Sequence, residues 1–192
     1  MSGFSSSALA EDLPPTHNFW LDARLSIKTE RFGEPAQQLS GRLLWRHGTT
    51  RNHIRLLSPF GQMVAELNTL NDQNGANGLV EARLADGRQF QAASLDELAR
   101  QSLGYSLPFE ALPDWLVGKG SIRSSVLRDD LQRPLQLTEG VWQVRYRYQA
   151  ENLSPSSILV SSEEGITLRL LIDRWTTNDE AFGESRGDEF VR

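Results

Sequence analysis

The sequence predicts a mainly β fold of the α+β class, an antiparallel sheet joined by a few helices. Before residue 93 and after residue 141, apolar residues alternate with polar ones, which is the pattern of strands with one buried face. Between these stretches the apolar spacing changes to three and four residues, as on an amphipathic helix. A chain of 192 residues suggests one domain that can bury a substantial core.

The first half of the chain predicts a series of strands joined by short turns. The first of them is the most regular, because apolar residues occupy every odd position from Phe19 to Ile27. Asp86-Gly87 is a strong signal for a two-residue hairpin turn between the last two strands. The expected strands cover residues 19–28, 39–46, 53–57, 62–68, 79–85 and 88–92.

Two helices are expected in the middle of the chain. Ser94-Leu95-Asp96-Glu97 has the pattern of a capping box and opens a helix that continues to about Leu103. A second, shorter helix runs from residue 108 or 109 to Val117, with Pro113 in its first turn or at a kink. Strands resume afterwards and are expected at residues 142–148, 157–161 and 166–175.

One-sided strands must bury their apolar face against a second layer. A second sheet, a closed barrel and a curled sheet capped by the central helices all satisfy this requirement. We favour the curled sheet, because the helices are few and lie together in the sequence. The ends predict a flexible N-terminal lead at residues 1–17 and a flexible acidic tail at residues 176–192, which leave 18–175 as the single folded domain.

Composition excludes several classes of function. The net charge is −5 with both signs spread along the chain, which argues against nucleic acid as a partner. The chain has no cysteine, so it forms no disulfide and carries no thiolate nucleophile. No apolar run approaches the length of a membrane span, and the first residues lack the features of a signal peptide. We therefore expect either a cytoplasmic protein or one from which a targeting segment has been removed.

Catalytic and metal chemistry have little support. The histidines are His17, His47 and His53, and no carboxylate lies near the last two in sequence to complete a zinc site. The acidic pairs Asp129-Asp130 and Glu163-Glu164 fall in expected turns rather than across a cleft. Motifs for a nucleophile elbow or a phosphate-binding loop are absent from the sequence. We expect a protein that is not an enzyme and needs neither a cofactor nor a metal.

Aromatic residues are more informative. Phe60 occupies the turn Ser58-Pro59-Phe60-Gly61 between two expected strands, a position that polar residues usually take. The residues alone favour a side chain that folds back onto the sheet, and the alternative is an exposed apolar finger that touches a membrane or an acyl chain. The tryptophans lie on separate elements, where they either fill the core or line a hydrophobic ligand site: Trp20, Trp45, Trp115, Trp142 and Trp175.

Several stretches together carry a resemblance to a known family. In order and spacing they resemble the LolB family of outer-membrane lipoprotein receptors of Gram-negative bacteria, over roughly residues 19–175. No single stretch is diagnostic. They are Phe19-Trp20-Leu21-Asp22-Ala23-Arg24-Leu25-Ser26-Ile27, Leu43-Leu44-Trp45, Ile54-Arg55-Leu56-Leu57-Ser58-Pro59-Phe60-Gly61, Asp86-Gly87-Arg88, Leu103-Gly104-Tyr105-Ser106-Leu107-Pro108, Leu112-Pro113-Asp114-Trp115-Leu116-Val117-Gly118 and Leu168-Arg169-Leu170-Leu171-Ile172-Asp173-Arg174-Trp175.

The resemblance implies a fold and a role. The fold is an incomplete antiparallel barrel, or half-barrel, with helices over its open mouth, covering residues 18–175. The role is to accept acylated lipoproteins from the periplasmic carrier LolA in a hydrophobic cavity and to insert them into the inner leaflet of the outer membrane. Pro59, Phe60 and Gly61 match a turn implicated in membrane delivery, whose apolar residue is usually Leu in the family. The resemblance therefore favours an exposed Phe60.

The resemblance also implies partners and a location. The partners are a LolA-type carrier, lipoprotein acyl chains and the outer membrane, with the protein acting as a monomer at its periplasmic face. Family members are anchored through an N-terminal cysteine, so we expect a chain whose anchor was removed or an unanchored relative, soluble as given. Alternative functions are a soluble periplasmic lipid-binding module for another amphiphile and a hydrolase that uses the cavity as an acyl pocket.

The apolar faces of the strands and of the central helices are expected to form the walls of the acyl cavity. The expected lining residues are Leu25, Ile27, Leu43, Trp45, Ile54, Leu56, Leu98, Leu112, Trp115, Leu116, Trp142, Val144, Tyr146, Leu168 and Leu170.

Overall fold

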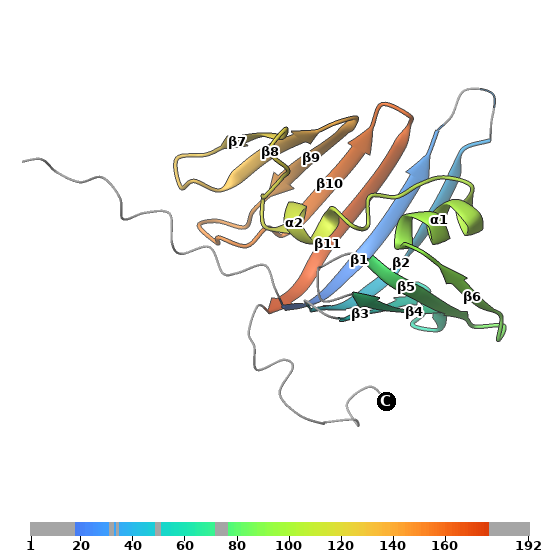
Figure 1. Ribbon diagram of the computed structural model, residues 1–192. Coiled ribbons are helices and arrows are strands. Elements are labelled where there is room, and N and C mark those ends of the chain that lie inside the picture. The colour runs from blue at the N-terminus through green and yellow to red at the C-terminus, as the bar shows by residue number, and fades with distance from the viewer. Residues whose placement is uncertain (1–17, 31–32, 34, 49–50, 72–76, 177–192) are drawn as a thin grey trace, which may run out of the picture.

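The computed structural model describes residues 18–30, 33, 35–48, 51–71 and 77–176. These residues form an antiparallel sheet of 11 strands and two short helices (Figure 1). The strands are β1 (Phe19–Thr29), β2 (Gln37–His47), β3 (Arg51–Leu57), β4 (Met63–Asn71), β5 (Asn77–Leu84), β6 (Gln89–Ala92), β7 (Ser125–Arg128), β8 (Pro134–Glu139), β9 (Trp142–Arg147), β10 (Ser157–Ser162) and β11 (Ile166–Thr176). The helices are α1 (Leu95–Leu103) and α2 (Leu112–Leu116).

The sheet consists of two meanders joined by the first and last strands. Its order is β6-β5-β4-β3-β2-β1-β11-β10-β9-β8-β7, so every neighbour pair except β1 and β11 is consecutive in sequence. The edge strands β6 and β7 are not paired with each other, and the sheet stays open. The prediction of a mainly β, curled antiparallel sheet that forms an incomplete barrel is confirmed.

The helices lie across the sheet because of this topology. The segment from β6 to β7 has to pass from one edge of the sheet to the other, and it contains both helices. Figure 1 shows α1 in front of the β1–β2 side and α2 in front of β10 and β11. Buried residues of both helices belong to the same hydrophobic cluster as the inward-facing residues of the strands. The helices therefore cover the concave face of the curled sheet, as expected.

The capping signal of α1 is used as predicted. The Ser94 side-chain oxygen accepts a hydrogen bond from the Glu97 N–H (3.0 Å), and Glu97 accepts one from the Ala93 N–H (3.0 Å). These bonds satisfy backbone donors that the first turn of a helix otherwise leaves without partners. The helix ends at Leu103, as the sequence predicts.

Two parts of the element prediction are wrong. Strands β7 and β8 were not expected, because the segment carries little alternation and β8 begins with Pro134, a residue that strands accept only at an edge or a first position. Helix α2 is shorter than expected and begins at Leu112, which places Pro113 in its first turn. The predicted lead at residues 1–17, which includes His17, and residues 177–192 of the predicted tail lie outside the described residues; Thr176 is the last residue of β11.

Candidate functional site

The residues expected to line an acyl cavity are brought together on the inner side of the sheet. All of them belong to one hydrophobic cluster, in which Leu56 and Trp142 are partly buried and the others are buried. The side chains of Leu116, Val144, Leu168 and Leu170 have no exposed surface at all. A side chain without accessible surface is in contact with protein atoms on every side. These residues therefore share the buried apolar interior between the sheet and the helices, and their role as the lining of an acyl cavity stays a prediction.

Several residues of this interior were not among the expected lining residues. Phe19, Leu21, Ile158 and Val160 are buried in the same cluster, and alternation along their strands already pointed to them. Leu137 lies on the strand β8 that was missed, and Leu107 lies in the loop between the helices, where no periodic pattern exists. On β11, Ile166 extends the same buried face and precedes Leu168 and Leu170 on it.

Helix α2 is held to the sheet by hydrogen bonds as well as by apolar packing. The Tyr146 hydroxyl on β9 donates to the Trp115 carbonyl (2.6 Å), and the Trp115 indole N–H donates to Glu139 on β8 (3.1 Å). Glu139 also accepts the Ser121 N–H (3.0 Å). Partial burial opposes ionisation of Glu139, but the bonds from Ser121 and Trp115 outweigh it and lower the pKa of this carboxyl. Trp142 packs at a tilted angle 6.4 Å from Trp115, centroid to centroid.

Helix α1 packs on the core through apolar side chains and is hydrogen-bonded to the segment before α2 rather than to a strand. It buries Leu95, Leu98 and Ala99 against the core, while Asp96 accepts a hydrogen bond from the Phe109 N–H (3.0 Å). This bond ties the start of α1 to the segment that leads into α2. Desolvation, together with the neighbouring Glu110 carboxyl, raises the pKa of Asp96 from its ordinary value of 3.8 to about 6. A titratable group thus sits between the two helices that cover the interior.

The turn between β3 and β4 presents Phe60 to solvent. The Ser58 side-chain oxygen accepts hydrogen bonds from the Phe60 N–H (3.3 Å) and the Gln62 N–H (3.2 Å), and the Ser58 N–H donates to the Gln62 carbonyl (2.7 Å). Gly61 adopts a positive φ of 82°, a conformation that glycine accepts without strain. The Phe60 side chain is 92% exposed. Of the two orientations considered for Phe60, the structure has the exposed one.

His47 and His53 both make contacts with neighbouring side chains. His53 pairs with Glu66 (2.8 Å between Nε2 and Oε1), and His47 stacks on Phe19 and contacts Asn52. Over the described ranges, no group of three or more His, Asp or Glu side chains is placed to hold a metal ion. No helix among the described residues has the length and apolar character needed to span a membrane.

Comparison with known proteins identifies the family. The family model described as outer membrane lipoprotein LolB matches residues 17–175. The chain belongs to the LolB family. Among its relatives, the outer-membrane lipoprotein LolB of Dechloromonas aromatica is 31% identical over 82% of this chain and 81% of its own length. The LolB of Thiobacillus denitrificans is 30% identical over 84% of this chain and 82% of its own length.

Among solved structures, a LolA superfamily protein from Nitrosomonas europaea aligns with 86% of this chain and 88% of its own. Its sequence identity to this chain is 10% and the TM-score is 0.46. The LolB match ends at Trp175, inside β11, and so includes both meanders, both helices and the Phe60 turn.

Proposed function

We propose that the protein is a lipoprotein receptor of the outer membrane, which accepts acylated lipoproteins from a LolA-type carrier and inserts them into the inner leaflet of that membrane. Relatives across the match are named outer-membrane lipoprotein LolB, which supports the location. The protein acts as a monomer at the periplasmic face and needs no catalytic residue, because transfer makes and breaks no covalent bond.

The observation that carries the proposal is the position of Phe60. The Phe60 side chain is 92% exposed at the tip of a hydrogen-bonded turn, so its contact with water contributes no favourable free energy. Buried in the acyl region of a membrane it gains the transfer free energy of an aromatic side chain, about 1.5–3 kcal/mol. Pro59, Phe60 and Gly61 therefore form the part of the protein that touches the membrane during delivery.

The apolar interior supplies the other half of the mechanism. An acyl chain costs about 0.8 kcal/mol per methylene in water, so a chain of ordinary length cannot cross the periplasm unshielded. Because the expected lining residues are packed together, acceptance requires contacts of the covering helices to be exchanged for contacts with acyl chains. Direction comes from a higher affinity for acyl chains in this protein than in the carrier, without a nucleotide.

Of the two helices over the sheet, we expect α1 to move away from it when cargo enters. Helix α2 is fastened to β8 and β9 by the bonds of Trp115 with Glu139 and Tyr146. Helix α1 packs against the core through Leu95, Leu98 and Ala99. These contacts are apolar, so contacts with an acyl chain can take their place. Entry of the cargo therefore displaces α1 while α2 remains in place.

A reconstituted transfer assay tests the proposal. The carrier is loaded with a radiolabelled lipoprotein and mixed first with the protein alone and then with outer-membrane vesicles. The unchanged protein and Phe60→Leu are expected to accept and deliver the cargo. Phe60→Glu is expected to accept it normally and to lose most of the delivery. If Phe60→Glu delivers the cargo at the same rate as Phe60→Leu, the proposed role of the turn in membrane delivery is wrong.

The same assay separates this function from storage or transport of another amphiphile. Native mass spectrometry of the purified protein shows which lipid it carries. A protein that binds fatty acid or phospholipid but takes no lipoprotein from the loaded carrier would be a lipid-binding module of another pathway, and the receptor proposal would fail.

A further inference from the structure

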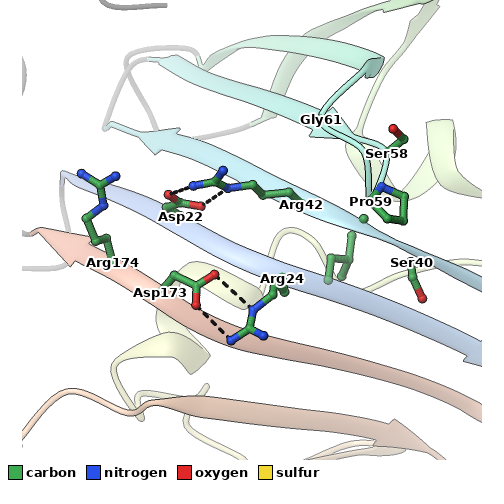
Figure 2. Close-up of a pocket in the computed structure, with 11 residues that line it drawn as sticks. Asp22, Arg24, Ser40, Arg42, Ser58, Pro59, Gly61, Asp173 and Arg174 are labelled. Atoms are coloured by element: carbon green, nitrogen blue, oxygen red, sulfur yellow. Dashed lines mark hydrogen bonds and ion pairs between the residues drawn. The ribbon is translucent and has the colours of Figure 1, made fainter.

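A second candidate binding site lies on the outer face of the sheet, next to the Phe60 turn. A pocket of about 600 Å³ opens there, a volume in the range of small-molecule sites. Figure 2 shows its charged residues on the neighbouring strands β2, β1 and β11, with Ser58 and Pro59 of the turn at its rim. The lining residues that matter here are Asp22, Arg24, Arg42, Ser58, Asp173 and Arg174.

A β-bulge gathers these charges. The register of β1 against β11 shifts between Asp22 and Ala23, where Asp22 pairs with Arg174 and Ala23 with Ile172. Asp173 is the extra residue, so it and Arg174 both line the outer pocket instead of facing opposite sides of the sheet. Arg24 binds Asp173 through Nε (3.2 Å) and Nη2 (3.1 Å).

The pocket keeps cationic donors available for a ligand. Arg42 uses Nε and Nη2 for Asp22, as Arg24 does for Asp173, so the Nη1 group of each takes no part in these pairs. The Arg174 guanidinium also lines the pocket and lies over the Trp20 ring, with its central carbon 5.3 Å from the ring centroid. The pocket contains three arginines and two aspartates, so its net charge is one positive charge.

We propose that this pocket binds the phosphate of a membrane phospholipid headgroup. A phosphodiester carries one negative charge, which matches the net charge of the pocket, and planar guanidinium groups suit phosphate oxygens. The Ser58 hydroxyl can add a neutral donor, because its oxygen already accepts the two N–H groups of the turn. The protein would then bind the membrane at two points. Phe60 would lie among the acyl chains, and a lipid headgroup would contact Arg24, Arg42 and Arg174.

The position of the pocket selects a lipid rather than a free anion. Its rim includes Pro59 and Gly61, the two neighbours of Phe60, so a phospholipid whose tails surround the Phe60 ring has its headgroup at the pocket. This inference rests on the proposed function, because headgroup binding in the pocket would position the Phe60 turn for lipoprotein delivery. Binding to vesicles needs no lipoprotein and no carrier, so the two proposals can fail separately.

The test measures binding of the full chain to vesicles by flotation. Vesicles of phosphatidylcholine have no net charge, so they report on contact with phosphate rather than on general attraction of basic residues. Vesicles of an uncharged galactolipid with the same acyl chains lack phosphate. The test variant is the double substitution Arg24→Gln and Arg174→Gln, whose side chains are exposed. Arg169→Gln is the control, an exposed arginine of β11 outside the pocket.

The expected results are specific. The unchanged protein and Arg169→Gln bind phosphatidylcholine better than galactolipid, and the double variant loses about fivefold or more of its binding to phosphatidylcholine alone. Thermal melting of each variant checks that the fold is retained. Equal binding of the two vesicle types, or an equal loss in Arg169→Gln, overturns the site. Saturable binding of inorganic phosphate in the pocket that does not depend on vesicles assigns it to a free anion and overturns the proposal as well.

Discussion

The hydroxyl of Tyr146 donates a buried hydrogen bond of 2.6 Å to the carbonyl of Trp115, which joins β9 to α2. The two residues are 31 positions apart, and the bond lies among the apolar side chains that the helices cover. Because hydrogen bonds in such surroundings are not exchanged with water, this contact keeps one of the two covering helices in a defined place on the sheet.

Tyr146→Phe removes that bond while keeping the ring. The Trp115 carbonyl retains the Gly118 N–H as a partner (3.0 Å), so the expected loss is about 1 kcal/mol of unfolding free energy. Hydrogen exchange at residues 112–118 should accelerate. Tyr148→Phe is the matched control, since its hydroxyl donates to the Pro134 carbonyl of β8 (2.8 Å) instead of to a residue of α2. Equal acceleration in both variants would contradict the role of the Tyr146 bond.

Asp96 makes stability depend on pH in a predictable direction. Its folded pKa of about 6 lies above its ordinary value of 3.8, so the unfolded chain loses this proton first as the pH rises. The contribution of Asp96 to stability is complete below about pH 4 and declines as the pH rises to about 6. Asp96→Asn keeps an oxygen for the Phe109 N–H and should abolish this decline. Thermal melts of both proteins between pH 3 and pH 7 measure the difference; parallel curves would show that Asp96 is not the group responsible.

Gly41 has no room for a side chain. A Cβ at this position of β2 would lie 2.3 Å from the backbone oxygen of Leu57, at the end of the strand that leads into the Phe60 turn. Gly41→Ala must displace that backbone, and we expect a cost of about 1–3 kcal/mol. The melting temperature should fall by roughly 2–4 °C for each kcal/mol. Ser40→Ala, one position away, should melt like the unchanged protein; a similar fall in both would mean that steric contact with Leu57 is not the cause.

The two outer ion pairs should differ in their importance for stability. The Asp22 side chain is 2% exposed and receives Nε (2.7 Å) and Nη2 (2.5 Å) of Arg42. Arg42→Gln leaves this carboxylate buried without its cation, and we expect a loss of about 1–3 kcal/mol. Arg24→Gln breaks a pair whose members are 64% and 39% exposed, and should cost less than about 1 kcal/mol.

A double substitution completes that comparison. Asp22→Asn in the Arg42→Gln background removes the stranded charge and should restore part of the lost stability in chemical denaturation. Absence of any rescue would show that Arg42 stabilises the fold through packing of its methylene groups rather than through its charge.

Local patterns were sufficient for much of the fold. Alternation from Phe19 to Ile27 identifies the inner face of β1, because side chains of a strand must alternate between its two sides. The capping residues Ser94 and Glu97 locate the start of α1, because they satisfy donors within a few residues of themselves. The turn at Ser58-Pro59-Phe60-Gly61 follows from the same kind of local chemistry.

Other features could not be read from neighbouring residues. Strands β7 and β8 have weak alternation, and they are strands because the second meander pairs them with each other and with β9. Whether the inner residues enclose a space or pack together depends on how closely the helices approach the sheet. That approach is set by contacts such as Tyr146 with Trp115, which join distant parts of the chain.

The sequence by itself determined which side chains of the regular strands face inward, where α1 begins and which turn carries Phe60, since each depends on chemistry within a few residues. The tertiary structure alone decided that Phe60 points into solvent and that a charged pocket lies beside it. Arg24 and Asp173 are 149 positions apart and meet only because β1 pairs with β11 and a bulge turns Asp173 outward. Register between the two ends of a chain is a property of the whole sheet, and no local pattern encodes it.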